Sequence, residues 1–141
     1  MKVLRLVLAT NIIIWLTACS TQAPPTELAP EPEIVKKAIA LQLNLTQTQL
    51  TQKLNAATPA LEIGQINVKQ LEPIFIAKLP AYHLQGTYDL TIKLPRQQAK
   101  QKNNPFEIYL QRQIEGKTWR LLKRETSKTE EKTQWNTYLI K

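Results

Sequence analysis

The 141-residue sequence contains one cysteine, Cys19, one histidine, His83, and one aspartate, Asp89. A Ser–His–Asp arrangement requires all three side chains within hydrogen-bond reach. His83 and Asp89 lie six residues apart on one predicted strand, a separation of roughly 20 Å. A zinc site needs three or four ligands from cysteine, histidine and carboxylates, which one histidine and one cysteine do not supply. We therefore predict no catalytic residues and no metal site.

Glycine is equally scarce. The three glycines stand at positions 64, 86 and 116, too far apart for a phosphate-binding loop or a dinucleotide fingerprint. Glutamate is common, and a pair such as Glu107 and Glu115 could in principle cleave glycosides if the two side chains met in space, but surface glutamates are frequent. We predict that the chain is not an enzyme and uses no cofactor.

No apolar run is long enough to cross a membrane. The longest, residues 6–16, follows the basic residues Lys2 and Arg5, and it is shorter than the 20 or so apolar residues that a spanning helix needs. A basic start followed by a short apolar run is the layout of a secretory signal. We predict a signal peptide over residues 1–18 rather than a permanent transmembrane helix.

The segment that ends this run, Leu16-Thr17-Ala18-Cys19, resembles the lipobox of bacterial lipoproteins. The resemblance implies a diacylglycerol on the Cys19 sulfur, cleavage before Cys19 and acylation of the new amino terminus. Two or more acyl chains anchor a protein firmly. The expected location is therefore a cell membrane, with the domain facing the periplasm or the cell exterior. If the cell has an inner and an outer membrane, Ser20 directly after the lipidated cysteine favours the outer one. The alternative is that Cys19 is a buried thiol in an apolar segment.

Residues 19–32 are rich in proline, namely Pro24, Pro25, Pro30 and Pro32. Such a segment favours extended, hydrated chain and is typical of a tether. Residues 33–141 then form a single domain. Loss of Lys2 and Arg5 with the signal peptide lowers the net charge from +8 to about +6, which suits anionic lipid, an acidic protein or a wall polymer.

A helix is predicted to begin at Pro32 or Glu33 and to end before Pro59. Its apolar positions recur at offsets of four and seven, as on one helical face. They are Val35, Ile39, Leu43, Leu50 and Leu54. The stretch from Asn44 to Thr48 is weaker, so the helix either continues through it or breaks into two.

The remainder of the domain is predicted to form strands. The clearest runs from Tyr82 to Leu94, where apolar residues or glycine alternate with polar ones, as in a strand with one wet face. Gly86 within it is a candidate bulge or close-approach point. Residues 63–71 and 73–79 predict a hairpin or bent strand, residues 97–104 an exposed loop, and residues 106–111, 118–123 and 134–140 three further strands. A turn at residues 115–117 and a charged loop at 125–133 separate the last three.

One helix followed by about five consecutive strands predicts an α+β fold. Short connections favour an antiparallel meander, and the helix covers its apolar face.

Basic residues gather in two places. One group lies at the end of the long strand and in the following loop: Lys93, Arg96, Lys100 and Lys102. The other lies toward the C-terminus: Lys117, Arg120, Lys123, Arg124, Lys128 and Lys132. Trp119 and Trp135 accompany the second group, and such patches can stack bases, but export argues against nucleic acid. We select Lys100, Lys102, Arg120 and Arg124 as possible partner contacts. The alternative is that both groups are solvated and both tryptophans lie in the core.

His83 also has two interpretations. It is either a pH-sensitive contact on a partner surface or an exposed strand residue paired with a polar neighbour.

The segments 104–112, 116–121 and 135–140, together with the helix and residues 84–94, resemble small cyanobacterial lipoproteins. That resemblance brings no known activity. The sequence as a whole predicts a membrane-anchored envelope lipoprotein with a non-enzymatic role in partner binding or assembly. The alternative is a carrier of a small molecule or lipid in a pocket between helix and sheet.

Overall fold

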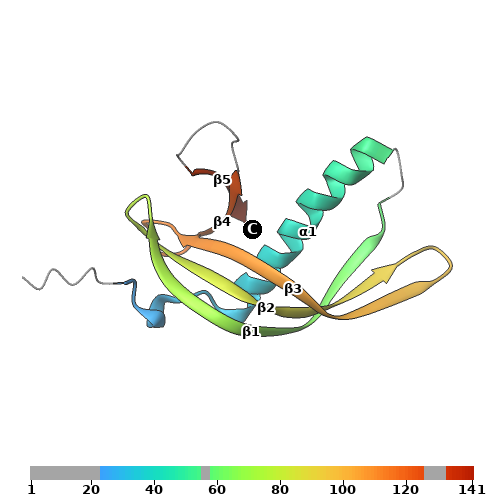
Figure 1. Cartoon of the computed structure of the whole chain (residues 1–141), viewed down its shortest axis with the longest axis horizontal. Coiled ribbons are helices and arrows are strands. Elements are labelled where there is room, and N and C mark those ends of the chain that lie inside the picture. The colour runs from blue at the N-terminus through green and yellow to red at the C-terminus, as the bar shows by residue number, and fades with distance from the viewer. Residues whose placement is uncertain (1–22, 55–57, 126–132) are drawn as a thin grey trace, which may run out of the picture.

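One helix packs on one face of a five-stranded antiparallel sheet in the computed structural model, which describes residues 23–54, 58–125 and 133–141 (Figure 1). The α+β prediction is confirmed. The strands follow the chain order β1-β2-β3-β4-β5, so the predicted meander is also confirmed. The elements are α1 (Pro32–Leu54), β1 (Ala60–Ile76), β2 (Leu79–Lys93), β3 (Gln98–Arg112), β4 (Trp119–Glu125) and β5 (Gln134–Ile140), preceded by the short 3-10 turn η1 (Thr26–Leu28).

Helix α1 is continuous, and the alternative of two helices is wrong. Thr46 and Thr48 donate their hydroxyls to the carbonyls of Gln42 and Asn44, one turn earlier, so both side chains are satisfied within the helix. The predicted apolar face holds only in the first half. Val35 and Ile39 are each 2% exposed, whereas Leu50 is 53% exposed.

Strand β1 joins the predicted segments 63–71 and 73–79 into one irregular strand but ends at Ile76, and Leu79 already begins β2. Its pairing with β2 is irregular between Ile63 and Ile66 and between Val68 and Gln70. Gly86 lies opposite the second irregularity, where a Cβ atom would stand 2.1 Å from the Asn67 carbonyl oxygen. The predicted close approach at Gly86 is therefore confirmed.

The predicted loop over residues 97–104 is wrong, because β3 begins at Gln98 and its polar residues pair with the end of β2. Lys100 lies opposite Thr91, and Ala99 opposite Ile92. The backbone amide of Asn103 donates to a carboxylate oxygen of Asp89 where the ladder is irregular. Side chains of residues 98–103 are exposed, and an exposed strand tolerates polar side chains. Backbone pairing with β2, rather than the side-chain pattern, therefore determines the conformation of this segment.

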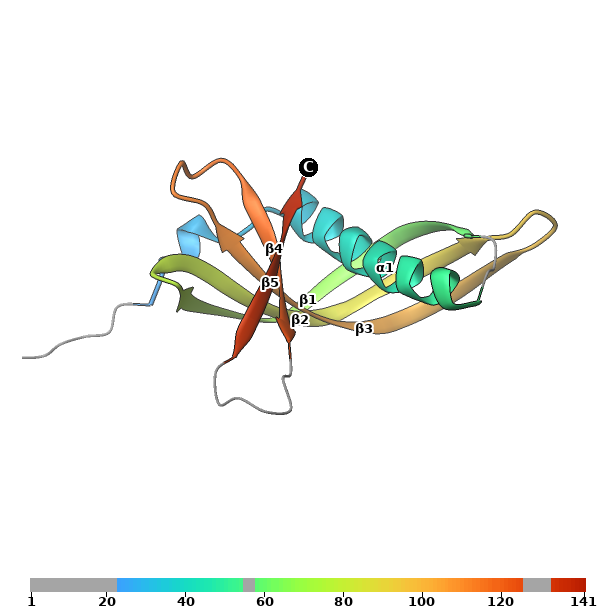
Figure 2. The ribbon, with the colours of Figure 1, turned by 90° about the horizontal axis from the view of Figure 1, so that it is seen from above.

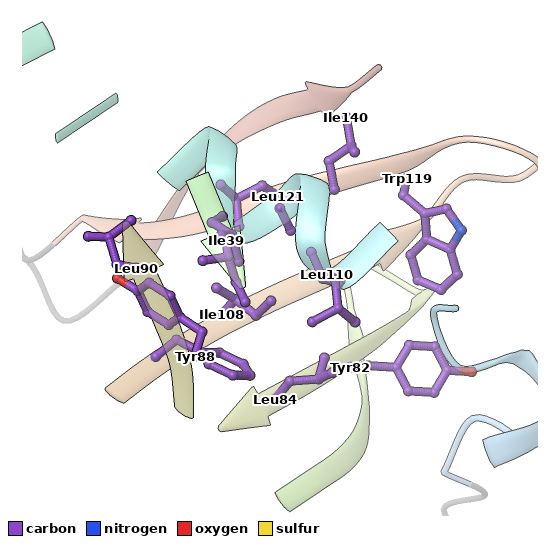
Figure 3. Packing of buried hydrophobic residues seen from close by; sticks show 14 residues of the cluster. Ile39, Tyr82, Leu84, Tyr88, Leu90, Ile108, Leu110, Trp119, Leu121 and Ile140 are labelled. Atoms are coloured by element: carbon purple, nitrogen blue, oxygen red, sulfur yellow. The ribbon is translucent and has the colours of Figure 1, made fainter. Parts of the chain in front are cut away.

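The core lies between α1 and the helix-facing side of the sheet (Figure 3). Tyr82, Leu84, Ile108, Leu110 and Leu121 are almost completely buried there. Trp119 joins them and packs at a tilt against Tyr82, with ring centroids 5.9 Å apart.

The expectation that both tryptophans lie in the core is wrong for Trp135. In β5 it is Ile140 that reaches the core, with Tyr138 packed against it, so Trp135 points to the opposite face. Both alternating sets of β5 contain an aromatic and an aliphatic residue, and the pattern therefore does not determine which set faces inward.

The described part of the predicted tether packs on the domain. Pro24 and Pro30 are buried, and the Tyr82 hydroxyl donates to the Pro25 carbonyl at 2.7 Å. Ala29 packs against the core.

Strands β4 and β5 cross the long strands at a steep angle (Figure 2). Strand β4 pairs with β3 only through Tyr109–Arg112, so β1, β2 and the first half of β3 continue as a three-stranded arm. Among the described residues, no helix is both long and apolar enough to span a membrane.

Candidate functional site

We call the sheet surface that faces away from α1 the outer face. The alternation of side chains along each strand, together with the strand pairing, places on it residues from all five strands. These residues are Glu72, His83, Gln85, Glu107, Tyr109, Arg120, Leu122, Arg124, Trp135 and Thr137.

His83 lies on this face and contacts residues of both neighbouring strands, β1 and β3. Its Nε2 atom lies 2.7 Å from a Glu107 carboxylate oxygen and its Nδ1 atom 3.5 Å from Glu72. Its ring stacks on the Tyr109 ring, with centroids 4.2 Å apart and planes 1° from parallel. The side chain is only 12% exposed. The alternative of a polar cross-strand pair describes these contacts, although His83 is less exposed than expected.

Aromatic packing continues from His83 across the sheet. Tyr109 meets Trp135 edge to face at 5.0 Å, in the geometry that aromatic pairs prefer. The Arg124 guanidinium lies 6.0 Å from the centre of the Trp135 ring, at the outer limit of a cation–π contact. These four residues form a row that we call the aromatic strip: His83 on β2, Tyr109 on β3, Trp135 on β5 and Arg124 on β4.

The charge of Glu107 is stabilised by its neighbours. The hydrogen bond to His83, followed by that from Gln85, holds the pKa of the Glu107 carboxyl below its ordinary value. Burial raises the pKa of the Tyr109 hydroxyl, so Tyr109 is a neutral hydrogen-bonding group. β3 therefore presents one anionic group, Glu107, and one neutral group, Tyr109, to His83.

This cluster does not form a metal centre. Glu72 and Glu107 bind different nitrogens of the His83 ring, so their carboxylates cannot converge on one ion. In the part of the chain that the structure describes, no three His, Cys, Asp or Glu side chains are arranged to hold a metal. The contacts fix the ring of His83 in place, and the arrangement is suited to recognition by shape and stacking.

A hollow of about 710 Å³, open to solvent, adjoins the aromatic strip. Its walls include the polar residues Lys69, Gln70, Gln85, Thr87 and Glu107. Its floor includes Gly86 and Phe106. The outer face thus combines a row of packed aromatic rings with a recess of mixed polar and apolar lining.

The four predicted partner contacts do not come together. Arg120 and Arg124 lie on β4 within the outer face, and Arg120 donates to the Thr137 hydroxyl at 2.9 Å. Lys100 and Lys102 lie on the exposed arm of β3, which projects away from β4 in both ribbon views (Figure 1, Figure 2). The predicted lipidation site, Cys19, lies outside the described residues.

Sequence reasoning singled out His83 but missed Glu72, Glu107 and Tyr109 as its partners. The signal that could have found them is strand register, but the turn at Pro95 does not give it alone. The turn pairs Lys93 with Gln98, and only the irregularity between Tyr88 and Leu90 then shifts the ladder by one residue. After that shift His83 lies opposite Tyr109 and Gln85 opposite Glu107.

Comparison of the chain with protein-family models, with curated proteins and with solved structures found no match.

Proposed function

We propose that this chain is an envelope lipoprotein, anchored to a membrane through lipid on Cys19, whose domain binds an acidic protein through the outer face. The domain carries no chemistry in this proposal. Its role is to present a fixed recognition surface at a membrane.

The observation that carries the proposed binding role is the aromatic strip. A sheet with a helix on one side leaves its other side in water, and such a face is normally polar. Here it bears a tyrosine, a tryptophan and two arginines, the residue types enriched at the energetic centres of protein interfaces. Tyr109 and Trp135 are already locked by their mutual contact and by His83. Little side-chain freedom remains to be lost on binding.

An acidic partner suits the charges of this face. Arg120 and Arg124 form no ion pair with any described carboxylate, whereas Lys93 is paired with Glu62. Arginine binds carboxylates in a planar, bidentate fashion. Glu72 and Glu107 contact His83 but remain more than half exposed, so we place the acidic partner at the β4 and β5 end of the outer face, where Arg120 and Arg124 lie.

A carrier role between helix and sheet receives less support. That interface is filled by core side chains such as Ile39, Ile108 and Leu121 (Figure 3). Hollows of about 280 and 430 Å³ flank α1 along its sides and are open to solvent.

Site-specific photo-crosslinking tests the binding role. A photo-reactive amino acid placed at Thr137, beside Trp135 and exposed on the outer face, should trap one defined protein in intact membranes. The same residue placed at Gln49, exposed on α1, is the matched control and should trap nothing specific. In the protein that carries the photo-reactive amino acid at position 137, Arg124→Glu should reduce the crosslink yield at least fivefold. Lys100→Glu, on the distant arm, should leave the yield unchanged. An unchanged crosslink in Arg124→Glu, or equal crosslinks from both probe positions, would contradict the proposed surface.

The anchor has a separate test. Cys19→Ala should leave a precursor that keeps residues 1–18 and takes up no labelled palmitate. Normal cleavage and membrane retention of this variant would refute the lipid anchor without bearing on the outer face.

A further inference from the structure

Three turns or short segments gather at one end of the domain, which we call the proximal end. They are η1, the β1–β2 turn and the β3–β4 turn, and the described chain begins beside them in both ribbon views (Figure 1, Figure 2). The arm of β2 and β3 ends at the opposite side of the molecule, at residues 94–97.

Each of the three segments at the proximal end exposes a large apolar side chain. Leu28 of η1 is 38% exposed, Phe75 before the β1–β2 turn 53%, and Ile114 in the β3–β4 turn 88%. Ile114 is the most exposed large apolar residue that the structure describes. Single exposed apolar residues are unremarkable, but three on neighbouring segments at one end of the domain are positioned to meet one surface together.

Ile114 is also held in place rather than carried on a loose loop. The amide of Gly116 donates to the Gln113 carbonyl, and that of Gln113 to the Thr118 carbonyl. The Arg112 guanidinium donates to the Gly116 carbonyl through two nitrogens, at 2.8 and 3.0 Å. A turn braced in this way keeps the isoleucine projecting into solvent, where nothing else in the described chain covers it.

The chain that leads to Cys19 leaves from this same end and is short. Pro24 is buried and the Pro25 carbonyl accepts a hydrogen bond from Tyr82, so only five residue steps separate Cys19 from the docked segment at Pro24. At 3.3–3.6 Å per residue, those five steps span at most about 18 Å. The polar headgroup layer of a bilayer leaflet is itself about 5–8 Å thick. A lipid on Cys19 therefore keeps the proximal end close to the membrane surface.

We infer that the proximal end rests on the bilayer, with Leu28, Phe75 and Ile114 inserted among the lipid headgroups. This inference rests on the proposed lipid anchor and adds an orientation to it. Charge plays little part, because Lys78 and Lys117 are offset by Glu27 and Glu115 in the same region, all four being exposed. The contact is apolar, and the arm with Lys100 and Lys102 points away from the membrane.

The test uses a polarity-sensitive fluorophore on the mature, lipidated protein in phosphatidylcholine–phosphatidylglycerol vesicles. Because Cys19 is the only cysteine and its sulfur is blocked by lipid, an introduced cysteine is labelled uniquely. The label at Ile114→Cys should be quenched by brominated acyl chains at least threefold more than the label at Leu94→Cys. Leu94 is the matched control, an apolar residue that is 39% exposed at the far end of the molecule.

A second variant separates contact from mere proximity. In a Leu28→Ser, Phe75→Ser background, quenching of the label at position 114 should fall by half or more, although the lipid still holds the protein on the vesicles. Equal quenching at positions 114 and 94 on vesicle-bound protein would overturn the orientation and leave the anchor standing. A mature N-terminal peptide that carries no acyl chains by mass spectrometry would instead refute the anchor itself.

Discussion

The rings of His83 and Tyr109, opposite one another on β2 and β3, stack with centroids 4.2 Å apart and planes within 1° of parallel. Stacking fixes the plane of the imidazole, and Glu72 and Glu107 fix its rotation within that plane. The central group of the outer face is therefore pre-organised before any partner arrives, and its electrostatics can be tested in the isolated protein.

The first prediction concerns Glu107. Its folded-state pKa lies below the ordinary value of 4.5, chiefly because of the hydrogen bond with His83. Folding therefore favours the charged form, and the stability it contributes is present above about pH 4.5 and lost as the pH falls through the lowered pKa. Glu107→Gln should reduce the free energy of unfolding at pH 7 by less than about 1 kcal/mol, since the carboxylate is more than half exposed. The difference from the wild type should shrink progressively as the pH falls below about 4.5.

Urea unfolding between pH 3 and 7 measures this effect. In a His83→Gln background, Glu107→Gln should lose most of its pH dependence, as a double-mutant cycle would show. A difference that stays constant from pH 7 to pH 3 would mean that the contact with His83 does not stabilise the charge.

The second prediction concerns the close approach of β1 and β2. Gly86→Ala would place its Cβ atom 2.1 Å from the Asn67 carbonyl oxygen and 2.9 Å from the Phe106 ring. The strands must separate to relieve this overlap, which should cost about 1–3 kcal/mol of stability. Gly64→Ala is the control, because its nearest contact is the Asp89 Cβ at 3.3 Å, and it should change stability by no more than about 0.5 kcal/mol. Equal effects in thermal unfolding would contradict the register of β1.

The third prediction concerns the docked proline segment. Tyr82→Phe removes the hydroxyl that binds the Pro25 carbonyl and should cost about 1 kcal/mol, the typical contribution of one hydrogen bond. Amide exchange over residues 26–29 should accelerate at the same time. Tyr88→Phe removes a hydroxyl that forms no hydrogen bond with the described residues and should leave that exchange unchanged. Protection that persists in Tyr82→Phe would show that other contacts hold the segment.

The fourth prediction separates the two halves of α1. Ile39→Ala opens a cavity in the core and should cost about 2–5 kcal/mol, whereas Leu50→Ala should stay within about 0.5 kcal/mol, because Leu50 is already 53% exposed. Chemical denaturation of the two variants gives both values. A large loss in Leu50→Ala would mean that the second half of the helix is covered by something outside the described residues.

The sequence predicted the fold class, the meander and the long strand β2, because strict alternation over thirteen residues depends on one buried face. Sequence-based prediction was wrong in two segments where the alternation of polar and apolar residues does not indicate which face is buried. Both sides of the β3 arm are wet, so Lys100 and Lys102 suggest a loop although their backbone is fully paired with β2. In β5 both alternating sets are amphipathic, and the phase assigned to Trp135 was wrong.

The candidate site was less predictable than the fold. His83 stood out as the sole histidine, but its partners come from β1 and β3, and they converge only after the strand register is fixed. The hydrogen bond from Tyr82 to the Pro25 carbonyl is a tertiary contact between residues 57 positions apart, and composition alone favours a hydrated tether there. Arg124 and Trp135 were both identified, although their contact depends on the pairing of β4 with β5.

The position of β5 beside α1 also affects the order in which the domain can fold during synthesis. The helix packs against β1, β3, β4 and β5, and β5 begins 80 residues after α1 ends. During synthesis from the N-terminus, Val35 and Ile39 therefore emerge long before Ile140, which completes the layer that covers them. Contacts so distant along the chain form slowly, and the helix spends that interval with its apolar side in water. The first regular element to be made is thus the last to be enclosed, and factors that bind unfolded chains would have their longest opportunity at the start of α1.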